Sequence, residues 1–140
     1  VWKLRIRQGK RVRQQVPFMP DLLFVYDSRK VLDPLVEQIA TLQYRFVKGG
    51  NHQPMTVRNA DMERFIRAVD AMNNPCFYTP EEINPDMLGK KVRIVGGLLD
   101  GYEGCLQKMQ GSRIKRLFVE LPNLLTAAVE VQPEFIQVLR

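Results

Sequence analysis

The sequence predicts an α+β fold divided between two small domains. Two segments in the first half of the chain show the apolar spacing of amphipathic helices. The second half consists almost entirely of short apolar and polar alternations bounded by glycine, asparagine or proline, which is typical of strands. Prolines and paired acidic residues separate the halves. We therefore expect an α/β sandwich-like domain over residues 1–75, a linker over 76–86 and a small all-strand domain over 87–140.

The composition is that of a globular protein. The chain has 140 residues, of which 45% are hydrophobic and 26% charged. No apolar run reaches the roughly 18 residues that cross a bilayer, so we expect no membrane partner. We expect a cytoplasmic protein because its two cysteines read as reduced thiols. Because the chain opens on Val1 in a strand-like segment, we also expect that an N-terminal part of the natural protein precedes it.

The reactive residue types predict neither a metal site nor an active site. Cys76 and Cys105 stand far apart, and His52 is the one histidine that might join them, so we expect two reduced thiols and no zinc. The sequence has no nucleophile elbow, phosphate-binding loop or paired-carboxylate pattern. We predict a protein that is not an enzyme, with no catalytic residue and no cofactor, in which His52 is a loop residue.

Positive charge is concentrated at the start of the chain. The net charge is +6, and residues 1–20 carry six bases and no acid, whereas residues 21–140 carry fifteen of each. Such asymmetry is typical of proteins that contact a polyanion, most simply nucleic acid.

This basic segment predicts a β-hairpin. Apolar and basic residues alternate over residues 2–7, a turn follows at Gly9, and a returning strand follows over residues 11–16. We expect one outer face to carry the cations and to contact nucleic-acid phosphates. The candidate nucleic-acid-binding residues are Lys3, Arg5, Arg7, Arg11 and Arg13. The alternative is a solvated strand face whose charges only prevent edge pairing.

Further elements are expected in the first half of the chain. The continuous apolar run Leu22–Tyr26 suits a central strand buried on both faces. Apolar spacing predicts helices over residues 29–43 and 60–72. Short strands are expected at residues 44–47 and 55–57.

Residues 88–104 form the most informative segment. Val92 and Ile94 alternate with basic residues, as in a strand with one buried face. Glycine is needed where φ is positive or where a second backbone comes close. Three glycines within eight residues therefore predict a tightly wrapped small barrel. They are Gly97, Gly101 and Gly104.

This segment resembles a KOW motif, the signature of small SH3-like barrels in transcription and ribosomal proteins. The matching residues are Gly89, Val92, Arg93, Ile94, Gly97, Gly101 and Gly104. One detail departs, because the family's usual Pro-Phe is Leu98-Leu99 here. The resemblance implies an SH3-like β-barrel over residues 87–140. The alternative is a glycine-rich hairpin in an unrelated β domain.

A strand–helix–strand–helix module ahead of a KOW barrel is similar to the NusG family of bacterial transcription elongation and antitermination factors. Residues 17–25 are similar to that family's apolar-Phe-Pro-Gly-Tyr-x-x-Val segment. Residues 53–57 and 62–66 are similar to the stretch entering the last helix of its N-terminal (NGN) domain. The family's first strand and helix precede this chain, so the resemblance implies an N-terminally truncated NGN domain.

The resemblance also implies a function. A monomeric factor would bind RNA polymerase through its first domain and recruit a termination factor or a ribosomal protein through its KOW domain. The residues that match the family's polymerase-docking patch are Phe18, Met19, Pro20 and Leu22. Met19, Asp21 and Leu22 replace the family's Phe, Gly and Tyr, which implies a specialised paralogue. The alternative function is that of an RNA- or ribosome-binding KOW protein that does not act on polymerase. For Leu22, the alternative role is ordinary burial in the core.

A second basic cluster surrounds the middle loop of the predicted barrel. It consists of Lys108, Arg113, Lys115 and Arg116. These cations would suit RNA or a protein partner. We favour a solvated cluster, because Glu103 and Glu120 lie nearby in sequence and dilute the positive field.

Overall fold

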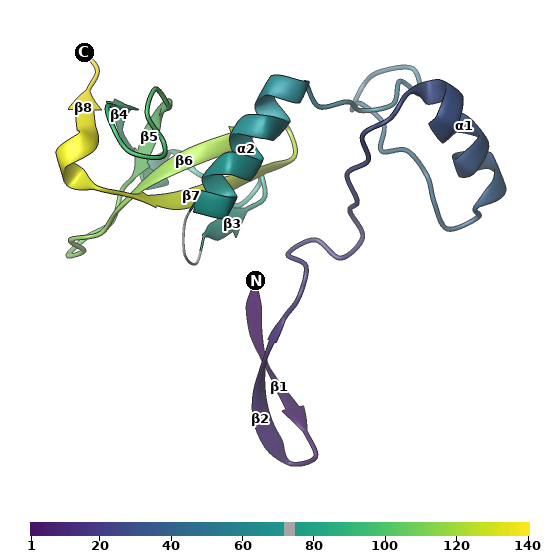
Figure 1. The fold of residues 1–140 in the computed structure, drawn as a ribbon, viewed down its shortest axis with the longest axis horizontal. Coiled ribbons are helices and arrows are strands. Elements are labelled where there is room, and N and C mark those ends of the chain that lie inside the picture. The colour runs from purple at the N-terminus through teal and green to yellow at the C-terminus, as the bar shows by residue number, and fades with distance from the viewer. Residues whose placement is uncertain (72–74) are drawn as a thin grey trace. The chain divides into compact units, whose positions relative to one another are not determined.

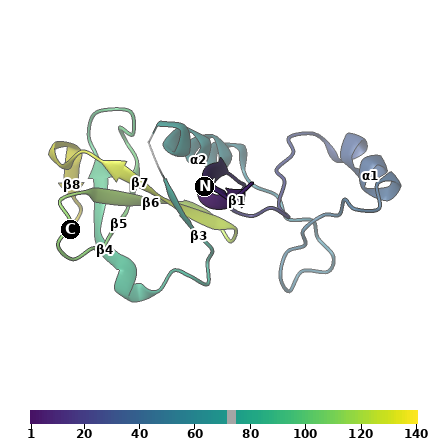
Figure 2. The ribbon, with the colours of Figure 1, turned by 90° about the horizontal axis from the view of Figure 1, so that it is seen from below.

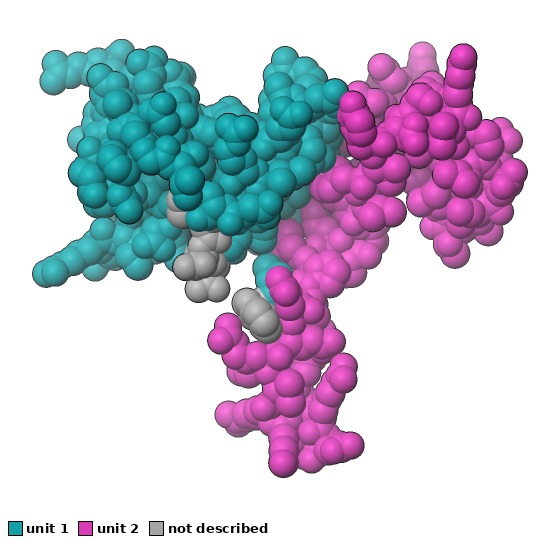
Figure 3. Space-filling model, viewed as in Figure 1, with its two compact units in different colours: residues 1, 57–140 teal, residues 2–56 magenta. Residues whose placement is uncertain are grey.

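The computed structural model describes residues 1–71 and 75–140, and within them it holds two α-helices and two β-sheets (Figure 1). The chain divides into two compact units, one of residues 2–56 and one of residues 57–140 together with Val1 (Figure 3). The predicted α+β class is confirmed. No helix in the described residues combines the length and apolar character that crossing a membrane requires.

The first sheet is a two-stranded antiparallel hairpin in the unit of residues 2–56. Its strands are β1, Trp2–Arg7, and β2, Lys10–Gln15. The turn residues Gln8 and Gly9 have φ values of 50° and 74°. Both values lie in the left-handed region that a type I′ hairpin turn uses. The predicted hairpin is therefore confirmed.

Helix α1 spans Arg29–Gln38 and ends before the predicted limit at residue 43. Ile39 is already extended, although its N–H still donates to the Leu35 carbonyl oxygen. The chain then turns back, and the Tyr44 hydroxyl donates to Asp33 Oδ1 at 2.6 Å. This bond lowers the pKa of Asp33 and raises that of Tyr44. Apolar spacing continues past the helix, so the pattern alone overestimates its length.

The predicted central strand at Leu22–Tyr26 is wrong. These residues form no strand, and Leu23 and Tyr26 are 72% and 87% exposed. No described segment pairs with this run, and an apolar run without a hydrogen-bonding neighbour does not build a sheet. The short strands expected at residues 44–47 and 55–57 reduce to one isolated bridge between Phe46 and Pro54.

The second sheet has six antiparallel strands in the order β3-β7-β6-β5-β4-β8 (Figures 1 and 2). Short 3₁₀ turns at Pro85–Met87 and Pro133–Phe135 lead into β4 and β8. The second half is therefore built of strands, as predicted. The edge strands β3 and β8 do not pair, so the described strands form an open sheet and not a closed barrel. The strands are β3 Cys76–Tyr78, β4 Leu88–Ile94, β5 Glu103–Gln107, β6 Lys115–Leu121, β7 Leu125–Val131 and β8 Ile136–Val138.

Helix α2, Asn59–Ala71, packs on this sheet along β6 and β7 (Figures 1 and 2). Phe65 and Ala68 are its buried residues, and the Phe65 ring lies 6.4 Å from that of Phe77 on β3. The predicted helix over residues 60–72 is confirmed in the described part of the chain. Its last predicted residue, Met72, lies outside the described residues.

The division between the units differs from the predicted one. Residues 76–78 were expected in a linker, yet they form β3 and pair with Thr126–Ala128 of β7. An amphipathic helix and an open sheet each have an apolar face to bury, and here they bury each other. In contrast, none of the described side chains of residues 2–56 is buried. The core therefore belongs wholly to the unit that begins at Val57.

Burial in this core alternates along β4, whereas β6 buries Leu117, Phe118 and Val119 in succession. Val92 and Ile94 are 0% and 2% exposed, which confirms the predicted buried face of β4. Leu117 and Val119 of β6 are likewise almost fully buried. By register, Val119 lies opposite Ala127, which in turn lies opposite Phe77. The Phe77 ring lies against Phe65 of α2, so α2 covers the face that Val119, Ala127 and Phe77 share.

Candidate functional site

The register of the hairpin divides its cations between two faces. Directly opposed residues of an antiparallel pair point to the same side. The two-residue turn places Arg7 opposite Lys10, so odd-numbered residues of β1 share a side with even-numbered residues of β2. We call one side the basic face; it carries Lys3, Arg5, Arg7 and Lys10 with Val12 and Gln14. We call the other the mixed face; it carries Leu4, Ile6, Arg11 and Arg13.

The expectation that all five candidate cations share one face is therefore wrong. Arg11 and Arg13 lie opposite Ile6 and Leu4, which are 77% and 69% exposed. An alternating pattern shows which residues of one strand lie together, but the turn length decides how two strands combine their faces. Lys10, which was not among the candidates, joins the basic face instead.

The basic face is suited to a row of phosphates. Its four cations are exposed, and none forms an ion pair with a described residue. Alternate residues along a strand lie about 7 Å apart, so the three cations of β1 form a regular line. Uncompensated cations attract the nucleic-acid backbone without reading its sequence.

The candidate polymerase-binding residues lie at one turn, with Phe18 directly before it. The Leu22 N–H donates to the Met19 carbonyl oxygen at 3.1 Å and closes this turn. Phe18, Met19 and Leu22 are half-buried, and Pro20 is exposed. Asp21, at the family's glycine position, is not in the left-handed region, so it causes no backbone strain there. The turn leads directly into the exposed apolar run that ends at Tyr26.

The glycines of the KOW-like segment meet the conditions that the sequence predicted. Gly97 and Gly101 have φ values of 73° and 86°. A Cβ on Gly104 would lie 2.8 Å from the Phe118 carbonyl oxygen, and one on Gly89 would lie 2.9 Å from that of Leu106. Two positions thus need glycine for conformation and two for close approach of backbones.

Arg93 of this segment joins two neighbouring strands. Its Nη2 lies 2.6 Å from Glu103 Oε1, and its Nε donates to the same oxygen at 2.8 Å. The hydrogen bond and the charge of Arg93 hold the pKa of Glu103 below its usual value. Arg93 therefore fixes β4 to β5, which is a structural role at a position that the motif singles out.

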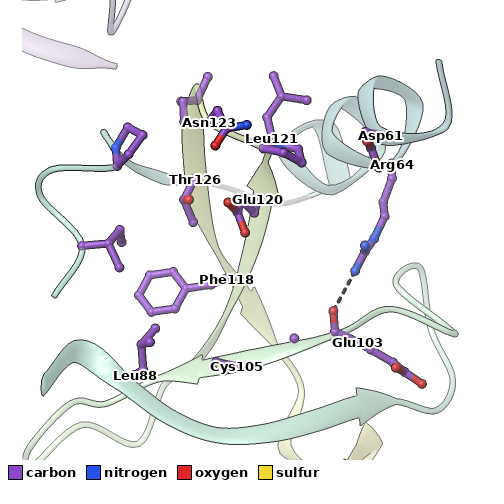
Figure 4. A pocket seen from close by; sticks show the side chains of 15 residues that line it. Asp61, Arg64, Leu88, Glu103, Cys105, Phe118, Glu120, Leu121, Asn123 and Thr126 are labelled. Atoms are coloured by element: carbon purple, nitrogen blue, oxygen red, sulfur yellow. Dashed lines mark hydrogen bonds between the residues drawn. The ribbon is translucent and has the colours of Figure 1, made fainter. Parts of the chain in front are cut away.

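A link between α2 and the sheet was not predicted from the sequence. The Arg64 guanidinium donates to the Glu103 carbonyl oxygen at 2.7 Å (Figure 4). The Tyr102 hydroxyl donates to the Arg64 carbonyl oxygen at 2.8 Å. Nearly forty residues separate the partners, and no local pattern marks either of them.

A pocket of about 490 Å³ adjoins this link (Figure 4). Ile83, Leu88 and Phe118 give it an apolar wall, and Glu103 and Glu120 also line it. No nucleophile and base are paired among its lining residues. In the described residues no three His, Cys, Asp or Glu side chains come together as metal ligands do.

The cysteines and His52 occupy separate places. Cys76 on β3 and Cys105 on β5 are both free thiols, and Arg116 Nη1 donates to Cys76 Sγ at 3.0 Å. The His52 ring packs edge-on against Phe46 at 5.4 Å, in the loop that the isolated bridge closes. His52 therefore lies in a loop, as the sequence predicts.

No protein-family model, curated protein or solved structure matches the chain.

Proposed function

We propose that the chain is a transcription elongation or antitermination factor. In this proposal the turn Phe18–Leu22 binds RNA polymerase, and the basic face of the hairpin contacts the nucleic acid that the polymerase holds. The sheet of residues 88–138 acts as an SH3-like KOW module that recruits a termination factor or a ribosomal protein. Residues preceding Val57 act as part of an NGN domain.

The observation that carries the proposal is the arrangement of the glycine-bounded strands. Five strands follow one another along residues 88–138, and β8 returns to pair with β4 along Val92–Ile94. Pairing of the last of these strands with the first also occurs in small barrels, so it supports the proposal, while the described sheet itself remains open. The order strand, glycine turn and strand over residues 88–107 is the order that a KOW motif would have, and it supports the proposal.

The charge distribution supports contact with nucleic acid. Residues 2–56 carry ten bases and four acids, whereas residues 57–140 carry eleven of each. The whole net charge of +6 thus lies in the unit that holds both the hairpin and the Phe18–Leu22 turn. A factor that binds polymerase and nucleic acid together favours the closed, elongating state of the enzyme, because it binds that state more tightly.

The test is binding of the full chain to purified bacterial RNA polymerase. Glutamates in place of Phe18 and Met19, the double variant F18E/M19E, should weaken binding at least tenfold, because charge is costly in an apolar interface. The matched control V95E/L98E adds the same two charges at apolar residues that are 52% and 71% exposed in the other unit. This control should bind as the parent chain does.

Two results contradict the proposal. One is a parent chain that does not bind polymerase. The other is a folded F18E/M19E variant that binds as tightly as the control. A chain that instead binds ribosomes or RNA and ignores polymerase supports the alternative KOW function.

A further inference from the structure

We propose that the loop between β5 and β6 is a second nucleic-acid-binding site, independent of the hairpin. We define the β5–β6 tip as residues 108–115. It carries three exposed cations, Lys108, Arg113 and Lys115, and no acid. In Figure 1 it projects beyond the ends of the two strands that it joins.

The acids that would dilute this charge lie at the other end of the strands. Glu103 begins β5 and Glu120 is near the end of β6, so each is five residues from the nearest tip lysine. Five residues of a strand span about 16 Å. Screening at physiological salt reduces electrostatic effects beyond about 8 Å. Glu103 and Glu120 therefore do not dilute the positive field of the tip in the way that their nearness in sequence predicts.

The contacts of Glu103 and Glu120 agree with a location away from the tip. Glu103 is already paired with Arg93. Glu103 and Glu120 both line the pocket of Figure 4, which contains no tip residue. The negative charge of β5 and β6 thus gathers at one end of the pair and the positive charge at the other.

Two other acids lie next to residues that adjoin or contact the tip, but they do not cancel its positive charge. Glu130 lies opposite Arg116, just outside the tip. Asp86 precedes Met87, whose carbonyl oxygen accepts a hydrogen bond from the Lys108 N–H at 2.8 Å. The three tip cations outnumber these two carboxylates, and none of the three forms an ion pair with a described residue. A positive excess remains.

The tip contains a local hydrogen bond and is partly apolar. Gly111 has a φ of 71°, and Ser112 Oγ accepts from the Ile114 N–H at 3.2 Å. Met109 and Ile114 are 41% and 45% exposed. The cations can contact phosphates, and the aliphatic side chains beside them can contact sugars and base edges. This combination suits nucleic acid better than a purely ionic partner. The tip and the hairpin belong to different units, so the two sites can be tested separately.

The experiment uses the full chain with fluorescein-labelled duplex DNA and single-stranded RNA, titrated over a range of KCl concentrations. The variant K108A/R113A/K115A removes the tip cations. The control R67A/K90A/R140A removes the same charge from exposed residues elsewhere in that unit. We expect the slope of log K against log salt on duplex DNA to fall by about 2 to 3 for the tip variant only, since each phosphate contact contributes about 0.9.

A third variant, K3A/R5A/R7A, separates the two sites. In this hairpin background the tip substitutions should still lower the slope. An equal fall of the salt slope in the tip variant and the control would show that only the total charge matters. That result would contradict a binding site at the tip. So would a tip effect that disappears in the hairpin background. The assay contains no polymerase, so its outcome is independent of the polymerase proposal.

Discussion

Arg64 and Tyr102 interact through a cation–π contact and a hydrogen bond. The guanidinium carbon of Arg64 lies 4.9 Å from the centre of the Tyr102 ring, and the Tyr102 hydroxyl donates a hydrogen bond to the Arg64 carbonyl oxygen. Burial raises the pKa of Tyr102. These contacts tie α2 to the start of β5, although the sequence pattern placed the two residues in different domains.

Removal of this hydroxyl tests whether α2 belongs to the sheet. Tyr102→Phe keeps the ring but leaves the Arg64 carbonyl oxygen without its donor, so the free energy of unfolding should fall by about 1 kcal/mol. Amide exchange in α2 should also accelerate. Tyr26→Phe is the control, because Tyr26 is 87% exposed. Unchanged stability and exchange in Tyr102→Phe would show that α2 does not rest on this contact.

Two glycines of the KOW-like segment should differ in their tolerance of a methyl group. At Gly101 a Cβ meets nothing within 4 Å, and only the φ of 86° is unfavourable. Gly101→Ala should therefore cost about 1 kcal/mol. At Gly104 the Cβ would meet backbone at 2.8 Å, and Gly104→Ala should cost about 2 to 3 kcal/mol. Urea denaturation measures both, and the reverse order would contradict the described approach of β5 to β6.

The Arg93–Glu103 pair predicts a pH dependence of stability. Arg93 lowers the pKa of Glu103 from 4.5 in the folded chain. The stabilisation is therefore present above the unfolded pKa and is lost as the pH falls through the folded pKa. Glu103→Gln should be less stable than the parent near neutral pH and should approach it in acid. Glu134→Gln, at an exposed position without an ion pair to a described residue, is the control. A constant difference at all pH values would exclude the linkage.

The two faces of the hairpin should differ in nucleic-acid binding. R5A/R7A removes two charges from the basic face, and R11A/R13A removes two from the mixed face. The first variant should lower the salt slope on duplex DNA by about 2, since each contact contributes about 0.9, and the second should change it less. Equal slopes would mean that the register does not decide which cations meet phosphates.

Local chemistry accounts for what the sequence predicted. Gly9 and Gly101 mark turns because their backbones need positive φ, and α2 follows from apolar spacing along one helix. Non-local contacts were missed. The run at Leu22–Tyr26 has the composition of a strand, but a strand also needs a neighbour. The segment Cys76–Tyr78 was assigned to a linker because only its pairing with β7 makes it a strand.

For the candidate sites, too, local features were predicted from the sequence and non-local ones were missed. The sequence shows where the charges are, but not which of them share a face. The two-residue turn places Arg11 and Arg5 on opposite faces of the hairpin. Glu103 and Glu120 lie at the end of β5 and β6 that is distant from the β5–β6 tip. Both results depend on how strands pair, which composition does not encode.

The lifetime of transcriptional pauses tests the central claim most directly. Purified RNA polymerase should leave pause sites sooner when the parent chain is present, and the F18E/M19E variant should lose this effect while V95E/L98E keeps it. Pause lifetimes that are the same with and without the parent chain, at concentrations that saturate binding, would contradict the account.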